Sequence, residues 1–217
     1  MSIYNAEYTI NYEYRNVLLT HFKDMGEIID FNKDTLIEFE YKKLNYIYLI
    51  LNGIVKQFFL DSNGVEKTIL ILTKGDMFGE ITMIQNDYDR VITRTYSPVK
   101  VCKINKDIFY NYLKNNPYVY DSILLMITTK FRILMYQIYD KTYLSTKERL
   151  FSLLRRLSVQ HGSLKETGYE INLNLTHEEL ATMIGSTRST VTKLLKTLES
   201  EGKITRNGKK IIFHYKI

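Results

Sequence analysis

Residues 176–200, THEELATMIGSTRSTVTKLLKTLES, decide the expected fold of the C-terminal third of the chain. Thr176 and Glu179 have the spacing of a capping box, so a helix should begin directly after Thr176. Gly185 should end that helix, because glycine is common just after a helix C-terminus. Ser186 is a suitable N-cap for a second helix, which should continue to about Ser200.

A β-hairpin is expected after the second helix. Residues 204–206 and 209–215 have strand-like sequences, and Asn207-Gly208 between them is typical of a type I′ turn. Residues 169–175 alternate between apolar and polar side chains like a further strand. Two helices around a glycine-containing turn, followed by a hairpin, predict a winged helix-turn-helix, whose second helix lies in the major groove of DNA.

The second helix should bury one face and present the other to DNA. Arg188 and Ser189 in its first turn are the expected base readers, since arginine can donate two hydrogen bonds to guanine O6 and N7. The alternative is a helical hairpin that contacts another protein. The inward face is expected to have Val191, Leu194, Leu195 and Leu198. Further DNA contacts are expected from Ser186, Thr187, Thr190, Thr192, Lys193 and Lys196, and from Arg206, Lys209 and Lys210 on the hairpin.

The charge is distributed unevenly along the chain. Residues 1–140 have 16 basic and 17 acidic side chains, whereas residues 141–217 have 14 basic and 7 acidic ones. The whole positive excess of the protein, +6 at pH 7, therefore lies in the last third. A basic module beside a nearly neutral one indicates a polyanionic partner for the C-terminal part.

Composition excludes several classes of protein. Hydrophobic residues make up 45% and charged residues 25%, as is usual for globular proteins. No apolar run reaches the roughly 18 residues of a membrane span, and residues 1–14 do not resemble a secretory signal. Cys102 is the single cysteine, which excludes an internal disulfide and an all-cysteine zinc or iron–sulfur site. His177-Glu-Glu-Leu-Ala lacks the second histidine of a metalloprotease motif, and no nucleophile-elbow, phosphate-loop or dinucleotide motif occurs, so we expect no enzyme.

Residues 28–104 consist of short strand-like segments separated by turn residues. The clearest strands are 46–51, 54–60, 67–73 and 99–104, and Asp61-Ser-Asn-Gly64 is a strong turn sequence. This spacing predicts a small β-roll, barrel or sandwich. Together with the helices that follow, it predicts an α+β fold.

Residues 106–140 change to a helical pattern. Residues 106–114 should form a short helix, and Pro117 should begin a long helix that continues to about Asp140. Ser145 and Glu148 form another capping box, which should open the helix before the helix-turn-helix. The long helix has two apolar stripes, of which one can pack on the β domain and the other on a second copy of the helix; the alternative is a single wide face that packs into the core. The side chains assigned to the dimer contact are Tyr120, Ile123, Leu124, Ile127, Phe131, Leu134 and Ile138.

Residues 175–204 closely resemble the DNA-binding motif of the Crp/Fnr regulators. Gly75-Asp-Met-Phe-Gly-Glu80 is similar to the glycine-bearing turn of the cyclic-nucleotide-type β-roll of that family. Gly185-Ser-Thr-Arg-Ser-Thr-Val-Thr-Lys193 is most similar to the cyanobacterial nitrogen-control regulator, and members from low-GC Gram-positive bacteria have similar sequences. The resemblance implies a β-roll sensor domain over residues 1–116, a dimerisation helix and hinge over 117–144, and a winged helix-turn-helix over 145–217.

The resemblance also implies partners. It implies a homodimer that binds an inverted repeat in double-stranded DNA and contacts RNA polymerase, as an activator or a repressor. It places the protein in the bacterial cytoplasm, with the plastid stroma as the alternative. Ser189 stands where many members have an acidic base reader, so the DNA site should differ from the familiar catabolite-activator site.

The effector is less clearly indicated. Cyclic-nucleotide sensors use a turn glutamate, an arginine with a hydroxyl residue, and polar groups on the dimer helix. Gly79, Glu80 and Arg90 match, but Val91 replaces the hydroxyl residue, and Leu134 and Met135 are apolar, so cyclic AMP is disfavoured. The resemblance to the nitrogen-control regulator implies 2-oxoglutarate as another candidate, whose two carboxylates need cationic groups such as Arg90 and Lys130.

Other effector chemistries and a sensor without an effector stay open. Haem could use His21, although a lone histidine is more often structural, and the cysteines of an oxygen-sensing cluster are absent. His161, His177 and His214 are expected to be structural. An effector bound near Glu80 and Arg90 would act on DNA by moving the basic domain on a hinge at about 140–145. An effector-independent regulator is the alternative.

Overall fold

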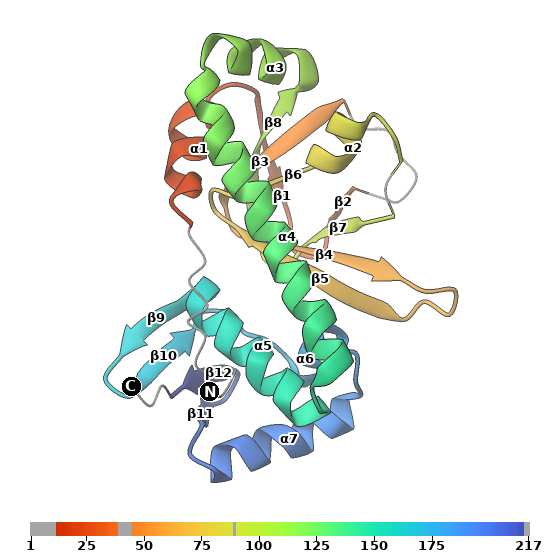
Figure 1. The fold of residues 1–217 in the computed structure, drawn as a ribbon, viewed down its shortest axis with the longest axis vertical. Coiled ribbons are helices and arrows are strands. Elements are labelled where there is room, and N and C mark those ends of the chain that lie inside the picture. The colour runs from red at the N-terminus through yellow and green to blue at the C-terminus, as the bar shows by residue number, and fades with distance from the viewer. Residues whose placement is uncertain (1–11, 39–44, 89, 215–217) are drawn as a thin grey trace. The chain divides into compact units, whose positions relative to one another are not determined.

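The computed structural model describes residues 12–38, 45–88 and 90–214 (Figure 1). They belong to two compact units that divide within one long helix, between Ile133 and Leu134, and each unit is described by itself. Both units combine antiparallel sheet with helices, which confirms the predicted α+β fold. Among the described helices, none is long and apolar enough to cross a membrane.

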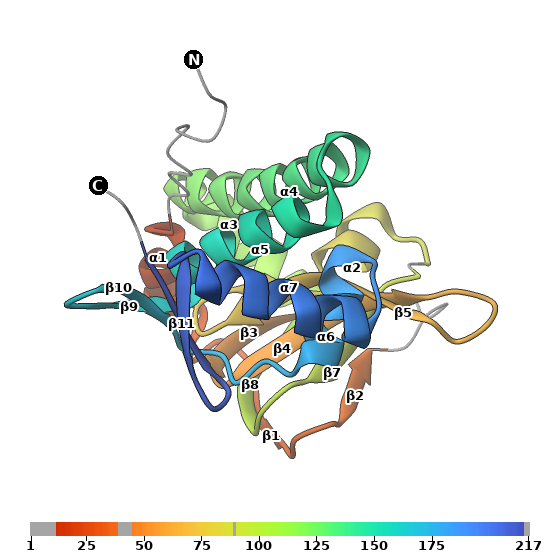
Figure 2. The same cartoon turned by 90° about the horizontal axis from the view of Figure 1, so that it is seen from below.

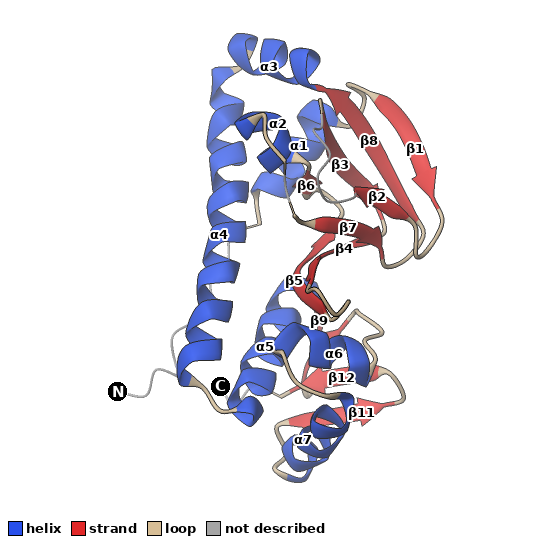
Figure 3. Ribbon diagram, turned by 90° about the vertical axis from the view of Figure 1, so that its right-hand side faces the viewer, coloured by secondary structure: helices blue, strands red, loops and turns tan. Residues whose placement is uncertain are grey.

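The N-terminal unit contains two four-stranded antiparallel sheets (Figure 3). One sheet has the order β1-β8-β3-β6 and the other β2-β7-β4-β5. Strands β3, β4, β5 and β8 are the four that the sequence predicts. The bounds are β1 (Glu27–Phe31), β2 (Leu36–Glu38), β3 (Tyr46–Asn52), β4 (Ile54–Leu60), β5 (Glu66–Thr73), β6 (Met77–Phe78), β7 (Ile92–Thr95) and β8 (Val99–Asn105).

Local hydrogen bonds explain why β4 and β5 pair as a hairpin. The carboxylate of Asp61 accepts from the backbone N–H groups of Asn63 and Val65, both at 2.8 Å, and Gly64 has a φ of +75°. An aspartate that bonds to the backbone ahead of it, with a glycine in the left-handed region, fixes a tight turn. The register that follows pairs Ile54 with Thr73 and Leu60 with Glu66.

Helices surround the sheets of this unit. They are α1 (Tyr14–Phe22), α2 (Glu80–Gln85), α3 (Lys106–Asn115), a short 3₁₀ turn (Pro117–Val119) and α4 (Tyr120–Tyr143). Asn105 caps α3 by accepting from the N–H of Asp107 at 2.8 Å. Pro117 starts the 3₁₀ turn, where its missing N–H costs little, so the long helix α4 begins at Tyr120 and not at Pro117 as predicted.

The two stripes of α4 have different surroundings. Val119, Ile123 and Met126 are buried in the main core of the unit, together with Phe22 and Phe109. In the other stripe, Tyr120, Leu124, Phe131 and Ile138 are exposed, while Ile127 and Leu134 are half-buried. The assignment of Ile123 to the dimer contact is therefore wrong, since its side chain fills the core, and Ile127 also packs partly against that core.

After α4, the C-terminal unit has three helices, which Figure 2 shows, and one four-stranded antiparallel sheet of order β11-β12-β10-β9. Its elements after α4 are α5 (Thr146–His161), β9 (Gly162–Lys165), β10 (Gly168–Ile171), α6 (His177–Ile184), α7 (Arg188–Ser200), β11 (Ile204–Asn207) and β12 (Lys210–Phe213). Ser145 and Glu148 form the predicted capping box at the start of α5. Leu150, Leu154 and Leu157 are buried along its inner face.

Three local predictions in this unit are wrong. Thr187, not Ser186, is the N-cap of α7, and its hydroxyl accepts from the N–H of Thr190. The hairpin turn has Gly208 and Lys209 at its centre, because Asn207 pairs with Lys210. Of these two, only Gly208 has a positive φ, which fits a type II′ turn and not type I′. Strand β10 ends at Ile171 and not near residue 175, and Tyr215, the last residue of the predicted hairpin, lies outside the described residues.

The long helix extends further than predicted, into the segment 140–145 where the sequence predicts the hinge. Helix α4 continues to Tyr143, and only Leu144 and Ser145 separate it from α5. Asp140 is buried; it accepts a hydrogen bond from Ser152 at 2.9 Å and pairs with Arg156, both on α5. The last turns of α4 are thus fixed to α5 by a buried ion pair.

Candidate nucleic-acid interface

Capping groups set the start and the end of α6, the first helix of the motif. Thr176 accepts from the N–H of Glu179 at 3.2 Å, and the Glu179 carboxylate accepts from the N–H of Thr176 at 2.6 Å. Gly185 ends α6 with a φ of +62°, a conformation that glycine adopts without steric cost. These contacts confirm the helix, glycine turn and second helix that the sequence predicts.

Helix α7 buries one face and exposes the other. Val191, Leu195 and Leu198 are buried, and Leu194 is half-buried, as predicted. The exposed face carries Arg188, Ser189, Lys193 and Lys196. The cationic side chains of Arg188, Lys193 and Lys196 have no ion-pair partner within the described part of the chain. Their charges are therefore available to an anion.

Hydroxyl groups gather at the N-terminal turn of α7. The hydroxyl of Thr187 lies 3.0 Å from that of Ser189 and 2.9 Å from that of Thr190. Ser186 precedes them at a half-buried position. This turn presents hydroxyl groups and helix N–H groups on the same side as Arg188, which is chemistry suited to phosphate oxygens and base edges.

Two of the predicted hairpin contacts have partners inside the protein. Arg206 donates from Nε and Nη2 to one carboxylate oxygen of Glu199, at 3.1 and 2.6 Å, and its backbone N–H donates to the other. This hydrogen bonding lowers the pKa of Glu199. Lys210 pairs with Glu170 at 2.9 Å. Lys209 is exposed and has no such partner in the described chain. It is therefore the available cation of the wing, which is the β11–β12 hairpin.

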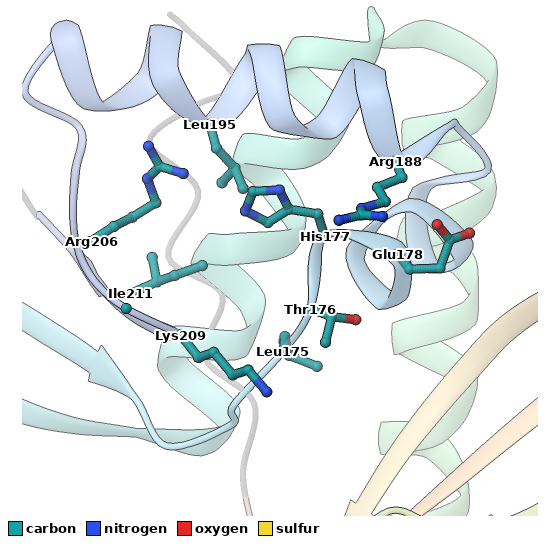
Figure 4. Close-up of a pocket in the computed structure, with 10 residues that line it drawn as sticks. Leu175, Thr176, His177, Glu178, Arg188, Leu195, Arg206, Lys209 and Ile211 are labelled. Carbon is teal, nitrogen blue, oxygen red and sulfur yellow. The ribbon is translucent and has the colours of Figure 1, made fainter.

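A groove of about 490 Å³ runs between α6, α7 and the wing (Figure 4). Its charged lining groups are Glu178, Arg188, Arg206 and Lys209, and His177 points into it. From the sequence we expect His177 to be structural. In the structure it lines the same groove as three cationic side chains. Thr192 bonds to His177 at 2.7 Å, so its hydroxyl is already engaged inside the protein.

The predicted effector residues of the β-roll lie at and near the start of α2. Gly79 has a φ of +90° and lets Glu80 turn inward. Lys130 of α4 donates to Glu80 Oε1 and to the carbonyl of Met77, both at 2.6 Å, and the Lys130 and Glu80 side chains are each 9% exposed. The second oxygen of Glu80 is buried and accepts no hydrogen bond from the described residues. Lys130 is therefore neutralised by Glu80, while Arg90 is exposed and Val91 half-buried.

Alternative sensor groups have ordinary structural roles. His21 Nδ1 lies 2.7 Å from the hydroxyl of Tyr112, and the ring of Tyr118 packs edge-on against the imidazole. Cys102 is fully buried, and burial raises the pKa of its thiol, which disfavours the reactive thiolate. No cluster of three potential metal ligands occurs among the residues that the structure describes.

Comparisons with known proteins agree with this architecture. A model of the Crp-like helix-turn-helix domain matches residues 148–215, and a model of the cyclic nucleotide-binding domain matches residues 28–116. The global nitrogen regulator of Nostoc sp. is 30% identical over 188 residues, which cover 85% of this chain and 83% of that protein. The chain belongs to the Crp/Fnr family of transcription regulators.

Other relatives support the same family. The cAMP-activated global regulator of Mycobacterium tuberculosis is 23% identical over 85% of this chain and 82% of its own length. Among solved structures, a CooA mutant from Carboxydothermus hydrogenoformans has a TM-score of 0.76 at 22% identity, covering 94% of this chain and 88% of that one. The c-di-GMP-responsive regulator Clp of Xanthomonas campestris has a TM-score of 0.75 at 18% identity, covering 92% of this chain and 99% of that one. The curated relatives are transcription regulators and not enzymes.

Proposed function

We propose that this Crp/Fnr regulator is a homodimer that binds an inverted repeat in double-stranded DNA and is controlled by a small effector in its β-roll. The observation that carries the proposal is the first turn of α7, where Arg188 and Ser189 are exposed while the opposite face of the helix is buried. A two-fold dimer would place one such turn at each half-site. The proposed DNA contacts are Ser186, Thr187, Arg188, Ser189, Thr190, Lys193, Lys196 and Lys209.

The exposed stripe of α4 supports the dimer. Leu124, Phe131 and Ile138 are 57–62% exposed and recur every seven residues. Exposed apolar side chains with this repeat are the seam that a second helix covers in a coiled coil. We propose that α4 of one subunit packs on α4 of the other through this stripe.

The effector is proposed from the surroundings of Glu80. Its unsatisfied buried oxygen would accept from a hydroxyl or N–H group of a bound molecule, since burial without a partner is costly. Val91 provides no hydroxyl for a phosphate, and the exposed Met135 provides no polar group for a base, so cyclic AMP is disfavoured. A 2-oxoglutarate site on Arg90 and Lys130 would require a carboxylate to replace Glu80 as the partner of Lys130. An effector-independent regulator is the second candidate.

The remaining proposals follow from the family. Regulators that bind promoters act on RNA polymerase, so we propose RNA polymerase as a partner of this protein. We propose that the protein acts in the bacterial cytoplasm and that it activates transcription. The competing function is a ligand-binding protein whose helix-turn-helix contacts another protein. The charge of the C-terminal third, with 14 basic and 7 acidic side chains, favours DNA.

Salt dependence of DNA binding tests the proposal. The affinity of the full chain for a short mixed-sequence duplex should fall steeply and log-linearly with salt concentration, because phosphate contacts release counterions. A chain whose helix-turn-helix contacts protein would show weak binding with little dependence on salt. Sedimentation velocity on the same sample should show a dimer.

A further inference from the structure

His177 is the first residue of α6, and its imidazole points into the groove between α6, α7 and the wing (Figure 4). The side chain is half-buried. Its surroundings are cationic on two sides, with Arg188 from α7 and with Arg206 and Lys209 from the wing. Glu178 of α6 is the one acidic group that lines the described groove, while Glu199 is bound to Arg206.

The hydrogen bonds around His177 define its tautomer. The hydroxyl of Thr192 donates to the carbonyl of Arg188, one helical turn earlier, at 2.8 Å. A hydroxyl has a single proton, so Thr192 can only accept from His177 Nδ1, which lies 2.7 Å away. Nδ1 therefore carries the proton. In the neutral ring Nε2 is then a lone-pair acceptor, and in the charged ring it is an N–H donor.

The charge state of His177 differs with and without an anion in the groove. Burial, together with the nearby charges of Arg206 and Arg188, lowers the pKa of His177 below the usual value of 6.5. The free protein at neutral pH thus has an uncharged imidazole with an acceptor nitrogen in a basic groove. A phosphate placed there would favour the charged imidazole, because an anion attracts a cation. It would also favour Nε2 as an N–H donor, because phosphate oxygens need hydrogen-bond donors.

We propose that His177 binds a DNA phosphate as an imidazolium, through Nε2, so that DNA binding takes up one proton for each subunit. The proposal rests on the DNA-binding function and adds a contact that depends on pH. Proton linkage fixes the direction of this pH dependence. The affinity for DNA rises as pH falls, by at most about tenfold per pH unit for each subunit.

A binding titration tests this linkage without knowledge of the target site, because phosphate contacts do not depend on sequence. The full-length protein is titrated with a short mixed-sequence duplex at constant ionic strength, between about pH 7.5 and pH 6, where histidine changes charge. The variants are His177→Gln, which cannot become charged, and His177→Lys, which is always charged. His214→Gln is the matched control, since its ring bonds to Thr205 and Thr167 and does not line the groove.

The wild type and His214→Gln should bind more tightly as pH falls. His177→Gln should have a smaller pH dependence than the wild type, and His177→Lys should bind tightly throughout. Calorimetry in buffers of different ionisation enthalpy should show proton uptake for the wild type and less for His177→Gln. A pH dependence in His177→Gln that is as large as that of the wild type would overturn this inference and leave the DNA-binding function intact. No binding of the wild type at any pH and low salt would overturn both.

Discussion

At the scale of single residues, Arg188 is the side chain on which sequence recognition is proposed to depend. It is exposed in the first turn of α7 and has no ion-pair partner in the described chain. Arg188→Ala should cost about 1–3 kcal/mol of binding free energy at a selected site and little on mixed-sequence DNA. Lys193→Ala, on the same face, should weaken both by a similar amount and reduce the salt slope by about 1. Equal losses on both DNAs for Arg188→Ala would contradict its role as a base reader.

Asp140 and Arg156 form the second residue-scale feature. The two side chains are 5% and 6% exposed, and Ser152 also donates to the carboxylate. Asp140→Asn keeps the shape but leaves Arg156 buried without a charge partner. Urea unfolding should therefore show a loss of about 3–5 kcal/mol. Asp121→Asn, at an exposed position near the start of α4, is the control and should change stability by less than about 0.5 kcal/mol.

His177 also makes the stability of the free protein depend on pH. Its pKa is lowered in the folded state, so the unfolded chain binds the proton more readily. The stability that this neutral imidazole provides is present above about pH 6.5 and is lost as pH falls through its folded-state pKa. The unfolding free energy of His177→Gln should therefore fall less between pH 7 and pH 5 than that of the wild type. A steeper fall in the variant would contradict the assigned charge state.

At the scale of elements, the exposed stripe of α4 makes a prediction about assembly. Phe131 is 62% exposed, so a charged side chain there should leave the fold of the subunit intact. Phe131→Glu should convert the dimer to a monomer in sedimentation velocity, because it places like charges at the same seam of both helices. Ile108→Glu, at a 48% exposed position on α3, should remain dimeric. A dimer that survives Phe131→Glu would require a different interface.

The elements that the sequence predicts best are those with complete local signals. Two capping boxes set the starts of α5 and α6, Gly185 sets the end of α6, and the turn at Asp61–Gly64 sets the β4–β5 hairpin. Helix α1 is not predicted from the sequence, because Glu13 at its N-cap makes no side-chain capping hydrogen bond. The extension of α4 beyond Asp140 depends on Arg156, 16 residues further along, and local patterns do not contain that contact.

The candidate site is likewise only partly predictable. Exposure of Arg188, Ser189 and Lys193 follows from helical periodicity, and the structure agrees with it. The pairing of Arg206 with Glu199 and of Lys130 with Glu80 depends on tertiary packing, which charge counting cannot reveal. The same holds for His177, whose neighbours in the groove come from α7 and the wing.

At the scale of the whole molecule, α4 connects the proposed sensor to the DNA-binding module. Lys130 is held by Glu80 near the proposed effector site, and Asp140 of the same helix is held by Arg156 of α5. We propose that an effector bound at Glu80 changes the position of α4, and that α5 follows because the buried pair fixes it to α4. Such coupling requires the effector to bind one of two states more tightly than the other.

The central claim is that a dimer of this chain reads a two-fold DNA sequence under the control of a small molecule. Selection of bound sequences from a random duplex pool, with and without metabolites from a cell extract, tests it most directly. We predict enrichment of an inverted repeat whose half-sites are one helical turn apart, about 10 base pairs, with stronger enrichment when the metabolites are present. A pool that stays random in both conditions would contradict the claim.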